Sequence, residues 1–392
     1  MIRNLKWPLA AVLAALLAAC GGGGGDTTPR VTVTKVKVLG DSLADVGTFG
    51  GVTATVQGSD SQLFPDRVAV SFGLARGCNF FAFTGVTFVA NPTAGCTNYA
   101  VGGGVINGAG SGLSPQDPRN LGVQFAASTA GGNFAATDLV VVDGGGNDAA
   151  ALVGAYLRAG MPVNAGGDGG ASYVAMLRTQ LSADVVNTAA AGGAAGLAAV
   201  GRTYMTALAD TFYSMIKTGA LDKGAERLVL LNMPGITNTP RFQSVLDGIA
   251  AASGGGAAGA TARGQSEALF KSWVEAFNSQ LATRVSGNAA VALVDFYTAF
   301  NDQVAHPEQF GLSNVKTPAC PMVGVGADGL PTYSFPTCTA TSLSAATPPA
   351  GASGGANWWK TYAFSDGFHP TPYGHQLLAQ LISRTLAQVG WL

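Results

Sequence analysis

The stretch VKVLGDSLADVG, residues 36–47, joins an apolar, β-branched run to a turn that contains glycine, aspartate and serine. Residues 31–39 alternate and then run apolar, which predicts a buried strand that ends at Gly40. Leu43 is expected to open a helix. Ser42 would then lie at a helix N-terminus, where free N–H groups and the helix dipole favour negative charge. On these residues alone, Ser42 is either a nucleophile or an ordinary helix cap.

Further short apolar runs follow along the chain. TDLVVVDGGGND, residues 137–148, also ends in a Gly-rich turn, and residues 227–235 and 289–296 are similar runs. Residues 97–104 form a weaker fifth run. Continuous apolar runs fit parallel strands that are covered on both faces. Because ligands bind beyond the C-terminal ends of such strands, Ser42 and the turn after the second run are expected at one edge of a sheet.

Helical patterns lie between these runs. Residues 203–217 form one, and residues 266–285 carry an apolar stripe on one face. The last helix has a clear start, with Thr371 as its N-cap and Pro372 in its first turn. Strands that alternate with helices predict the α/β class, with a mostly parallel, five-stranded sheet.

Several long segments carry no strand pattern. Two Ala- and Gly-rich stretches, residues 149–200 and 248–262, are predicted to be surface insertions, and residues 317–357 to be a long loop. There is no internal repeat and no convincing linker after Arg30. We therefore predict one domain over residues 31–392.

The N-terminus resembles an export signal. Two basic residues precede an apolar segment, residues 7–19, which is too short to span a bilayer as a helix of about 20 residues. LLAAC, residues 16–20, resembles a bacterial lipobox, which implies cleavage before Cys20 and a lipid on Cys20. An ordinary signal peptide with an incidental cysteine is the alternative. We predict a signal peptide over residues 1–19 and a lipid-anchored Gly-rich tether over residues 20–30.

This signal sets the expected location and partners. The protein is expected at the bacterial outer membrane, on its periplasmic or cell-surface face, or secreted if the lipobox is not used. The chain has 21 basic and 22 acidic residues among 392, for a formal net charge of −1. Such a balance gives no basic surface for a polyanion, so no nucleic-acid partner is expected.

Four cysteines remain after Cys20, and an even number in an exported chain predicts two disulfides. Three pairings are possible. The sequential one, Cys78–Cys96 and Cys320–Cys338, closes two local loops, each worth about 3 kcal/mol by the chain-entropy estimate. A metal site is the alternative, but the chain has no CxxC pair and only three histidines.

A nucleophilic serine needs a base within hydrogen-bond reach, and the base needs an orienting group. In SDGFHPTPYGH, residues 365–375, Asp366 lies three residues before His369 and could turn back to hold its imidazole. His306 is expected in a loop, and His375 is expected to pack or to lie at the surface of the last helix. We therefore predict His369 as the base and Asp366 as its partner.

Acyl transfer also needs donors aimed at the oxyanion. Asn147 lies in the Gly-rich turn after the second run, where its side-chain amide could point across the strand ends. In NYAVGGG, residues 98–104, the glycines offer exposed backbone N–H groups, because glycine lets the chain approach closely. Taken singly, Asn147 is also explained as a cap and the glycines as a turn.

As a set, these segments resemble the GDSL, or SGNH, hydrolase family. GDSLADVG matches the first family block, which implies that Ser42 is the nucleophile and that its N–H contributes to the oxyanion hole. NYAVGGG matches the second block. There Gly103 best fits the oxyanion glycine, although Gly102 stays possible.

The last two blocks are also present. Gly-x-Asn-Asp, residues 145–148, implies that Asn147 is the side-chain donor to the oxyanion. Asp-x-x-His-Pro, residues 366–370, implies that Asp366 and His369 complete the triad. The segments HPEQFGLSNVKTPAC and WWKTYAFSDGFHPT also resemble the secreted and outer-membrane lipase-esterase branch.

The resemblance implies a serine carboxylic-ester hydrolase, an esterase or lipase, on a three-layer α/β/α, flavodoxin-like fold. It implies an acyl-enzyme intermediate and no metal or organic cofactor. The alternatives are an acyltransferase and a non-catalytic surface lipoprotein that uses the fold for binding.

The substrate is less defined than the reaction. A small-molecule, lipid or polymer ester would suit a tethered surface enzyme. Four aromatic residues precede the triad loop and are expected either to line an apolar acyl site or to pack under the final helix; these are Trp358, Trp359, Tyr362 and Phe364.

Two competing motifs lack their structural context. Residues 351–355 fit the G-x-S-x-G nucleophile pattern with Ser353, but no strand precedes them. Residues 254–259 fit G-x-G-x-x-G, again without a strand, so we predict no dinucleotide site.

Overall fold

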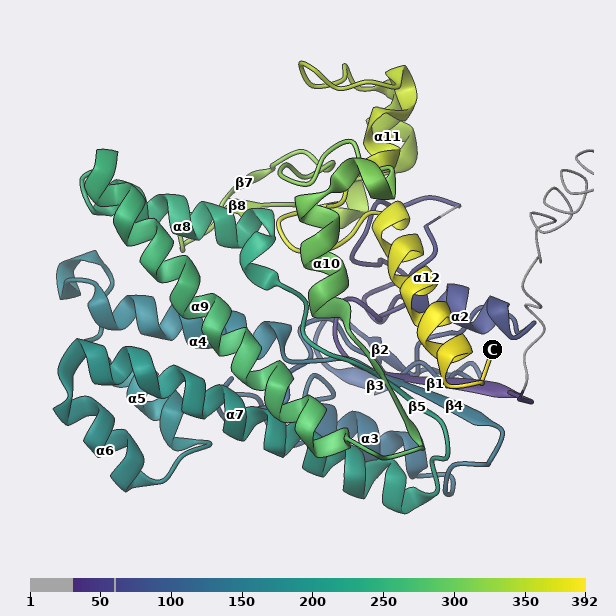
Figure 1. Ribbon diagram of the computed structural model, residues 1–392. Helices are drawn as coiled ribbons and strands as arrows, with labels where there is room; N and C mark the ends of the chain where they lie inside the picture. Colours follow the sequence, from purple (N-terminus) through teal and green to yellow (C-terminus); the bar gives the residue numbers. More distant parts are fainter. Residues whose placement is uncertain (1–30, 60) are drawn as a thin grey trace, which may run out of the picture.

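The computed structural model describes residues 31–59 and 61–392 (Figure 1). The predicted signal peptide, the lipid on Cys20 and the tether lie outside the described residues. They stay predictions, for which mass spectrometry of the mature N-terminus is the direct test.

Four parallel strands form the central sheet, in the order β1-β4-β5-β6. Their bounds are Lys35–Leu39 for β1, Asp138–Val142 for β4, Leu228–Leu231 for β5 and Val291–Val294 for β6. Every residue of β4 and β5 is buried, as expected for central strands covered on both faces. The predicted α/β class with a parallel sheet is confirmed.

The fifth run does not form a strand. Asn98 makes one parallel bridge to Val38 of β1, and the Tyr99 N–H donates to the Val38 carbonyl at 2.7 Å. The Asn98 side chain then donates to the Ala44 carbonyl and accepts from the Ala100 N–H, which turns the chain away from the sheet. The predicted count of five strands is therefore corrected to four, with this bridge in the fifth place.

Helices cover both faces of the sheet and give three layers (Figure 1). On one face, Leu139, Val141, Val229 and Leu231 join a core cluster with α2, α10 and α12. On the other, Val140, Val142, Leu228 and Leu230 join a second cluster with α3, α4, α5, α7 and α9. The bounds are Phe64–Ser71 (α2), Leu121–Thr129 (α3), Gly146–Gly160 (α4), Ala171–Arg178 (α5), Gly193–Gly219 (α7), Gly256–Val285 (α9), Phe296–Ala305 (α10) and Pro372–Gln388 (α12).

Each predicted helix lies within an observed one. Residues 203–217 fall in α7 and residues 266–285 in α9. The last helix, α12, starts as predicted, because the Thr371 side chain accepts the Gly374 N–H and Pro372 occupies the first turn. No helix in residues 31–59 and 61–392 is long and apolar enough to cross a membrane.

The Ala- and Gly-rich stretches are helical and largely exposed, but the first also buries Leu152, Tyr173 and Leu177 in the core, so it is not only a surface insertion. Residues 149–200 build most of α4, α5 and α6 (Ala183–Ala191) and the start of α7. Residues 248–262 join α8 (Pro240–Ala252) to α9. Glycine lets these helices meet closely: a Cβ on Gly196 would lie 2.2 Å from the Ala189 carbonyl oxygen, and one on Gly259 would lie 2.5 Å from that of Ala250.

The two disulfides take the sequential pairing, Cys78–Cys96 and Cys320–Cys338. The first encloses a hairpin of β2 (Phe81–Phe83) and β3 (Phe88–Ala90). The second encloses a hairpin of β7 (Gly324–Val325) and β8 (Pro331–Thr332), within the predicted long loop, where α11 (Ala340–Ala345) also lies.

Candidate active site

Ser42 follows β1, but no helix begins at Leu43. Residues 41–45 form a single turn, in which the Ala44 and Asp45 N–H groups both donate to the Asp41 carbonyl at 3.1 Å. The predicted helix N-terminus at Ser42 is therefore wrong. Stabilisation of negative charge at this position depends on individual N–H groups and not on a helix dipole.

The Asp45 carboxylate explains why the chain does not continue as a helix. It accepts the Gly47 and Thr48 N–H groups, at 2.9 and 2.8 Å, and the Gly102 N–H at 2.8 Å. Gly102 is therefore already paired. In contrast, neither Ser42 nor Gly103 uses its backbone N–H in a hydrogen bond within the described part of the chain. Gly103 adopts φ +80°, which suits glycine and leaves its N–H available.

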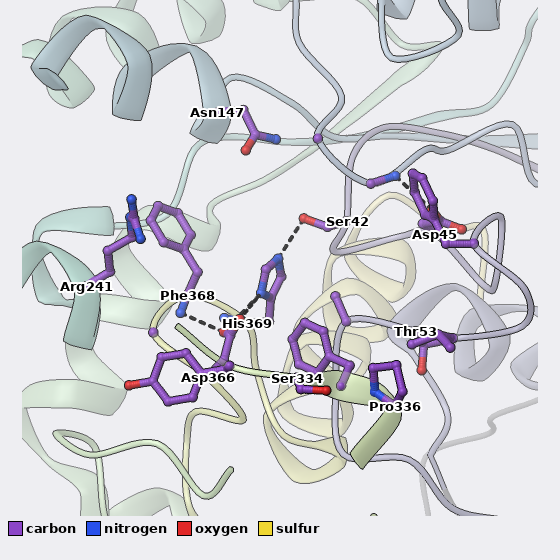
Figure 2. Close-up of a pocket in the computed structure, with 18 of the residues that line it drawn as sticks. Ser42, Asp45, Thr53, Asn147, Arg241, Ser334, Pro336, Asp366, Phe368 and His369 are labelled. Carbon is purple, nitrogen blue, oxygen red and sulfur yellow. Dashed lines mark hydrogen bonds and ion pairs between the residues drawn. The ribbon is translucent and has the colours of Figure 1, made fainter. Parts of the chain in front are cut away.

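Ser42, His369 and Asp366 form a continuous hydrogen-bonded row (Figure 2). The Ser42 Oγ lies 2.7 Å from His369 Nε2, and His369 Nδ1 lies 2.9 Å from Asp366 Oδ2. The side chains of His369 and Asp366 are only 18% and 14% exposed. The nucleophile, base and orienting group that the sequence predicts thus lie in the order that proton transfer needs.

The two charged partners shift each other's pKa. Burial alone would lower the pKa of His369, but the negative charge of Asp366, its hydrogen bond and the charge of Asp41 outweigh burial and raise it. Burial alone would raise the pKa of Asp366, but attraction to His369 and hydrogen bonds from His369 and Phe368 outweigh burial and lower it. Both shifts favour an imidazolium beside a carboxylate.

The loop between Asp366 and His369 is built by local hydrogen bonds. The Asp366 carboxylate accepts the backbone N–H groups of Phe368 and His369, at 2.8 and 2.7 Å. The Ser365 N–H donates to the His369 carbonyl at 2.7 Å. Pro370 and the Thr371 cap then lead into α12. The short Asp-x-x-His spacing therefore brings the carboxylate back onto its own histidine.

Asn147 lies in the first turn of α4, and its Nδ2 donates to the Gly104 carbonyl at 2.9 Å. The neighbouring Asp148 carboxylate accepts the N–H groups of Ile106 and Asn107, at 2.9 and 2.8 Å. Burial raises the pKa of Asp148 to about 6. Asp148 therefore joins residues 106–107, which follow the glycines at 102–104, to the first turn of α4. This contact fixes the position of Asn147, a role of Asp148 that the sequence analysis missed.

Two further buried carboxylates lie behind Ser42. The Asp41 N–H donates to the Asp143 carboxylate at 3.3 Å. The Gln124 side-chain amide accepts the Gly40 N–H and donates to the Gly40 carbonyl. A Cβ on Gly40 would lie 1.4 Å from Asp143 Oδ1, so only glycine fits there. Burial, and then the charge of Asp41, hold the pKa of Asp143 well above its usual range. No local motif marks Gln124 or Asp143, because their partners are distant in sequence.

A cleft of about 810 Å³ opens above these groups (Figure 2). Its walls include Phe49, Arg241, Tyr333, Phe335 and Phe368, together with Ser42 and His369. This volume suits a small organic ligand or one segment of a longer one.

The four aromatic residues before Asp366 do not line this cleft, but Phe364 lines a second, smaller cavity of about 50 Å³ that also touches Ser42 and His369. Trp358, Trp359 and Tyr362 pack around the Cys320–Cys338 disulfide. Phe364 packs with Phe300 and α12. Packing under the final helix, as expected, is therefore seen for Phe364, which also lines the smaller cavity at Ser42, whereas the other three residues pack around the disulfide and line neither cavity.

The other two histidines lie away from Ser42. His306 pairs with Asp302 at 2.8 Å on the surface. His375 is fully buried in α12, and burial, His369 and Arg67 lower its pKa to about 3, so it is neutral. In residues 31–59 and 61–392, no group of three or more His, Cys, Asp or Glu residues could hold a metal ion.

Comparison with known proteins gives one family. The model of the family described as "GDSL-like Lipase/Acylhydrolase" matches residues 36–382, which include Ser42, Gly103, Asn147 and His369. No curated protein matches the chain. Among solved structures, the chain is similar to an extracellular lipase from Streptomyces rimosus, with 16% identity over 90% of this chain and 100% of that one and a TM-score of 0.41.

Proposed function

Since the chain belongs to the GDSL-like lipase/acylhydrolase family and is a hydrolase that acts on esters, we propose that Ser42, His369 and Asp366 are its catalytic triad. The observation that carries this proposal is the row of hydrogen bonds from Ser42 through His369 to Asp366. A serine hydroxyl becomes nucleophilic only when a base accepts its proton, and the oriented imidazole supplies that base.

The reaction has two stages. In the first, the Ser42 Oγ attacks the ester carbonyl carbon while His369 Nε2 takes its proton. The imidazolium then returns that proton to the departing alcohol oxygen, and an acyl-Ser42 ester remains. In the second stage, His369 takes a proton from water, the resulting hydroxide attacks the acyl-enzyme, and Ser42 leaves with that proton. Asp366 keeps Nδ1 protonated and stabilises the imidazolium throughout.

The oxyanion would be held by three donors. The Ser42 and Gly103 N–H groups are not otherwise engaged within the described residues. The Asn147 amide donates to the Gly104 carbonyl at 2.9 Å and makes a long contact, 3.5 Å, to Asp41 Oδ2. The oxyanion would replace Asp41 as the acceptor of this second hydrogen, because a donor–acceptor distance of 3.5 Å marks a weak hydrogen bond. Donors that are fixed before the reaction cost little reorganisation when negative charge develops.

Covalent labelling tests the nucleophile directly. A fluorophosphonate ester should react with one serine per chain, and mass spectrometry should place the adduct on Ser42. The variant Ser42→Ala should not be labelled. The variant Ser353→Ala, which removes the serine of the competing motif, should be labelled at the wild-type rate. An adduct on Ser353, or none on Ser42, would contradict the proposal.

Asn147 is expected to matter mainly in the transition state. Asn147→Ala should lower kcat by roughly 10²- to 10³-fold, because an oxyanion donor acts on charge that the ground state lacks. KM should change little. Steady-state kinetics with p-nitrophenyl butyrate measures both constants, and Asn187→Ala, a surface asparagine bonded to Arg178, is the matched control. A loss confined to KM would indicate substrate binding instead.

A further inference from the structure

The segment closed by the Cys320–Cys338 disulfide forms one wall of the active-site cleft. We name residues 321–337 the cleft flap. Five of its residues line the cleft beside the catalytic groups; these are Pro331, Tyr333, Ser334, Phe335 and Pro336. The reaction described above assigns no role to any of them.

Both ends of the cleft flap are bound to other cleft walls. The Cys320 N–H donates to the Ser365 carbonyl at 2.8 Å, directly before Asp366 in the chain. At the other end, the Gln57 N–H donates to the Cys338 carbonyl at 2.8 Å. We call residues 365–369, which hold Asp366 and His369, the triad loop. The disulfide between these two ends therefore links the triad loop to the loop that follows Ser42.

The tip of the cleft flap is bound as well. Asp328 forms an ion pair with Arg241, which lines the cleft at the start of α8. The Arg241 backbone N–H in turn donates to the Gly367 carbonyl at 2.9 Å, within the triad loop. The cleft flap is thus attached at three points and holds a defined position against the triad loop.

Phe335 brings the cleft flap into contact with the base. Its ring lies edge-on to the His369 imidazole, with the ring centroids 5.5 Å apart. Figure 2 shows Asn147 on one side of the Ser42–His369 pair and Ser334 and Pro336 on the other. Asn147, the proposed oxyanion donor, and the cleft flap therefore lie on opposite sides of the Ser42–His369 pair.

The direction of proton transfer tells which part of an ester lies near the cleft flap. The proton that His369 takes from Ser42 goes to the departing alcohol oxygen, so that oxygen must come within hydrogen-bond reach of Nε2. The carbonyl oxygen must point the other way, toward Gly103 and Asn147. The alcohol portion is thus directed toward the side of His369 on which Phe335 packs.

We propose that the cleft flap is the wall that selects the alcohol portion of the ester, and that Phe335 is the residue that contacts it. This inference rests on the proposed triad mechanism. It predicts that changes in the cleft flap alter discrimination among alcohols when the acyl group is constant. Discrimination among acyl groups with a constant alcohol is set by other walls.

Two substrate series separate these effects. In the first, ethyl and benzyl butyrate share an acyl group. In the second, p-nitrophenyl acetate, butyrate and octanoate share an alcohol. For Phe335→Ala, the benzyl-to-ethyl ratio of kcat/KM should fall by roughly tenfold, since one lost apolar contact has about that effect on discrimination. Its acyl-length profile should match the wild type. Phe49→Ala, another phenylalanine of the cleft, should keep the benzyl-to-ethyl ratio.

The disulfides supply a second matched pair. Both join cysteines 18 positions apart, so removal of either should cost similar stability. Cys320→Ser with Cys338→Ser should change the benzyl-to-ethyl ratio, and Cys78→Ser with Cys96→Ser should not. An active wild type whose variants all keep the ratio would overturn this inference alone. A wild type that turns over no ester would overturn the proposed function.

Discussion

Replacement of Ser42 with alanine is expected to lower kcat for p-nitrophenyl butyrate hydrolysis by about 10⁴-fold or more, since triad residues act as a unit. Without the hydroxyl, no acyl-enzyme can form. The residual rate would come from water activated by His369 and from oxyanion donors that remain in place. Release of p-nitrophenol at saturating substrate measures this loss.

The fold should survive this change, because Ser42 is only partly buried and its Oγ bonds to His369 alone within the described residues. The thermal midpoint of Ser42→Ala should therefore stay close to that of the wild type. Ser353→Ala, in an exposed loop, should keep full activity. A Ser42→Ala protein with wild-type kcat would remove Ser42 from the mechanism.

Replacement of Asp366 with asparagine is expected to lower kcat by about 10⁴-fold, since the amide favours the wrong imidazole tautomer. It should also change the pH dependence. His369 must be neutral to act as a base, and the charge of Asp366 raises its pKa above the ordinary 6.5. The acidic limb of wild-type kcat/KM should therefore lie above pH 6.5, and Asp366→Asn should move it to lower pH.

Kinetics from pH 5 to pH 9 measures that shift. A second aspartate–histidine pair, Asp302 with His306, has the same kind of contact at 2.8 Å but lies on the surface. Asp302→Asn should leave both kcat and the pH profile unchanged. An acidic limb that stays in place in Asp366→Asn would show that His369 is not the titrating base.

The same pair should contribute to stability in a defined pH window. The raised pKa of His369 contributes stability that is complete below pH 6.5 and is lost as pH rises through the folded-state pKa. The lowered pKa of Asp366 contributes stability that is present above pH 3.8 and is lost as pH falls through its folded-state pKa. Between those limits both contributions are present.

The sequence predicts best what local patterns determine. Short apolar runs locate all four strands, and the Thr371–Pro372 start of α12 depends on adjacent residues only. The Asp366–His369 contact is similarly local, since three positions separate the partners. The structure brings this pair to Ser42, where the parallel topology places strand ends together.

Distant contacts determine what the sequence analysis got wrong. The sequence predicts a helix that begins at Leu43. In the structure the chain turns instead, because the Asp45 carboxylate accepts the N–H of Gly102, 57 positions away. The Ala- and Gly-rich stretches resemble loops because glycine is a poor helix former, and only the close approach of neighbouring helices explains its use there. The position of the cleft flap likewise depends on Gln57, Arg241 and Ser365.

The hydrogen bond between Ser42 and His369 spans 327 positions of the chain. Ribosomes make protein from the N-terminus, so Ser42, the proposed nucleophile, is synthesised long before His369, its proposed base. The helix α12, which packs Leu378 and Ile382 in the same core cluster as α2, is also the last element of the chain to be synthesised. From the proposed roles of these two residues, Ser42 and His369, we expect any prematurely terminated product that stops before residue 369 to lack activity toward esters.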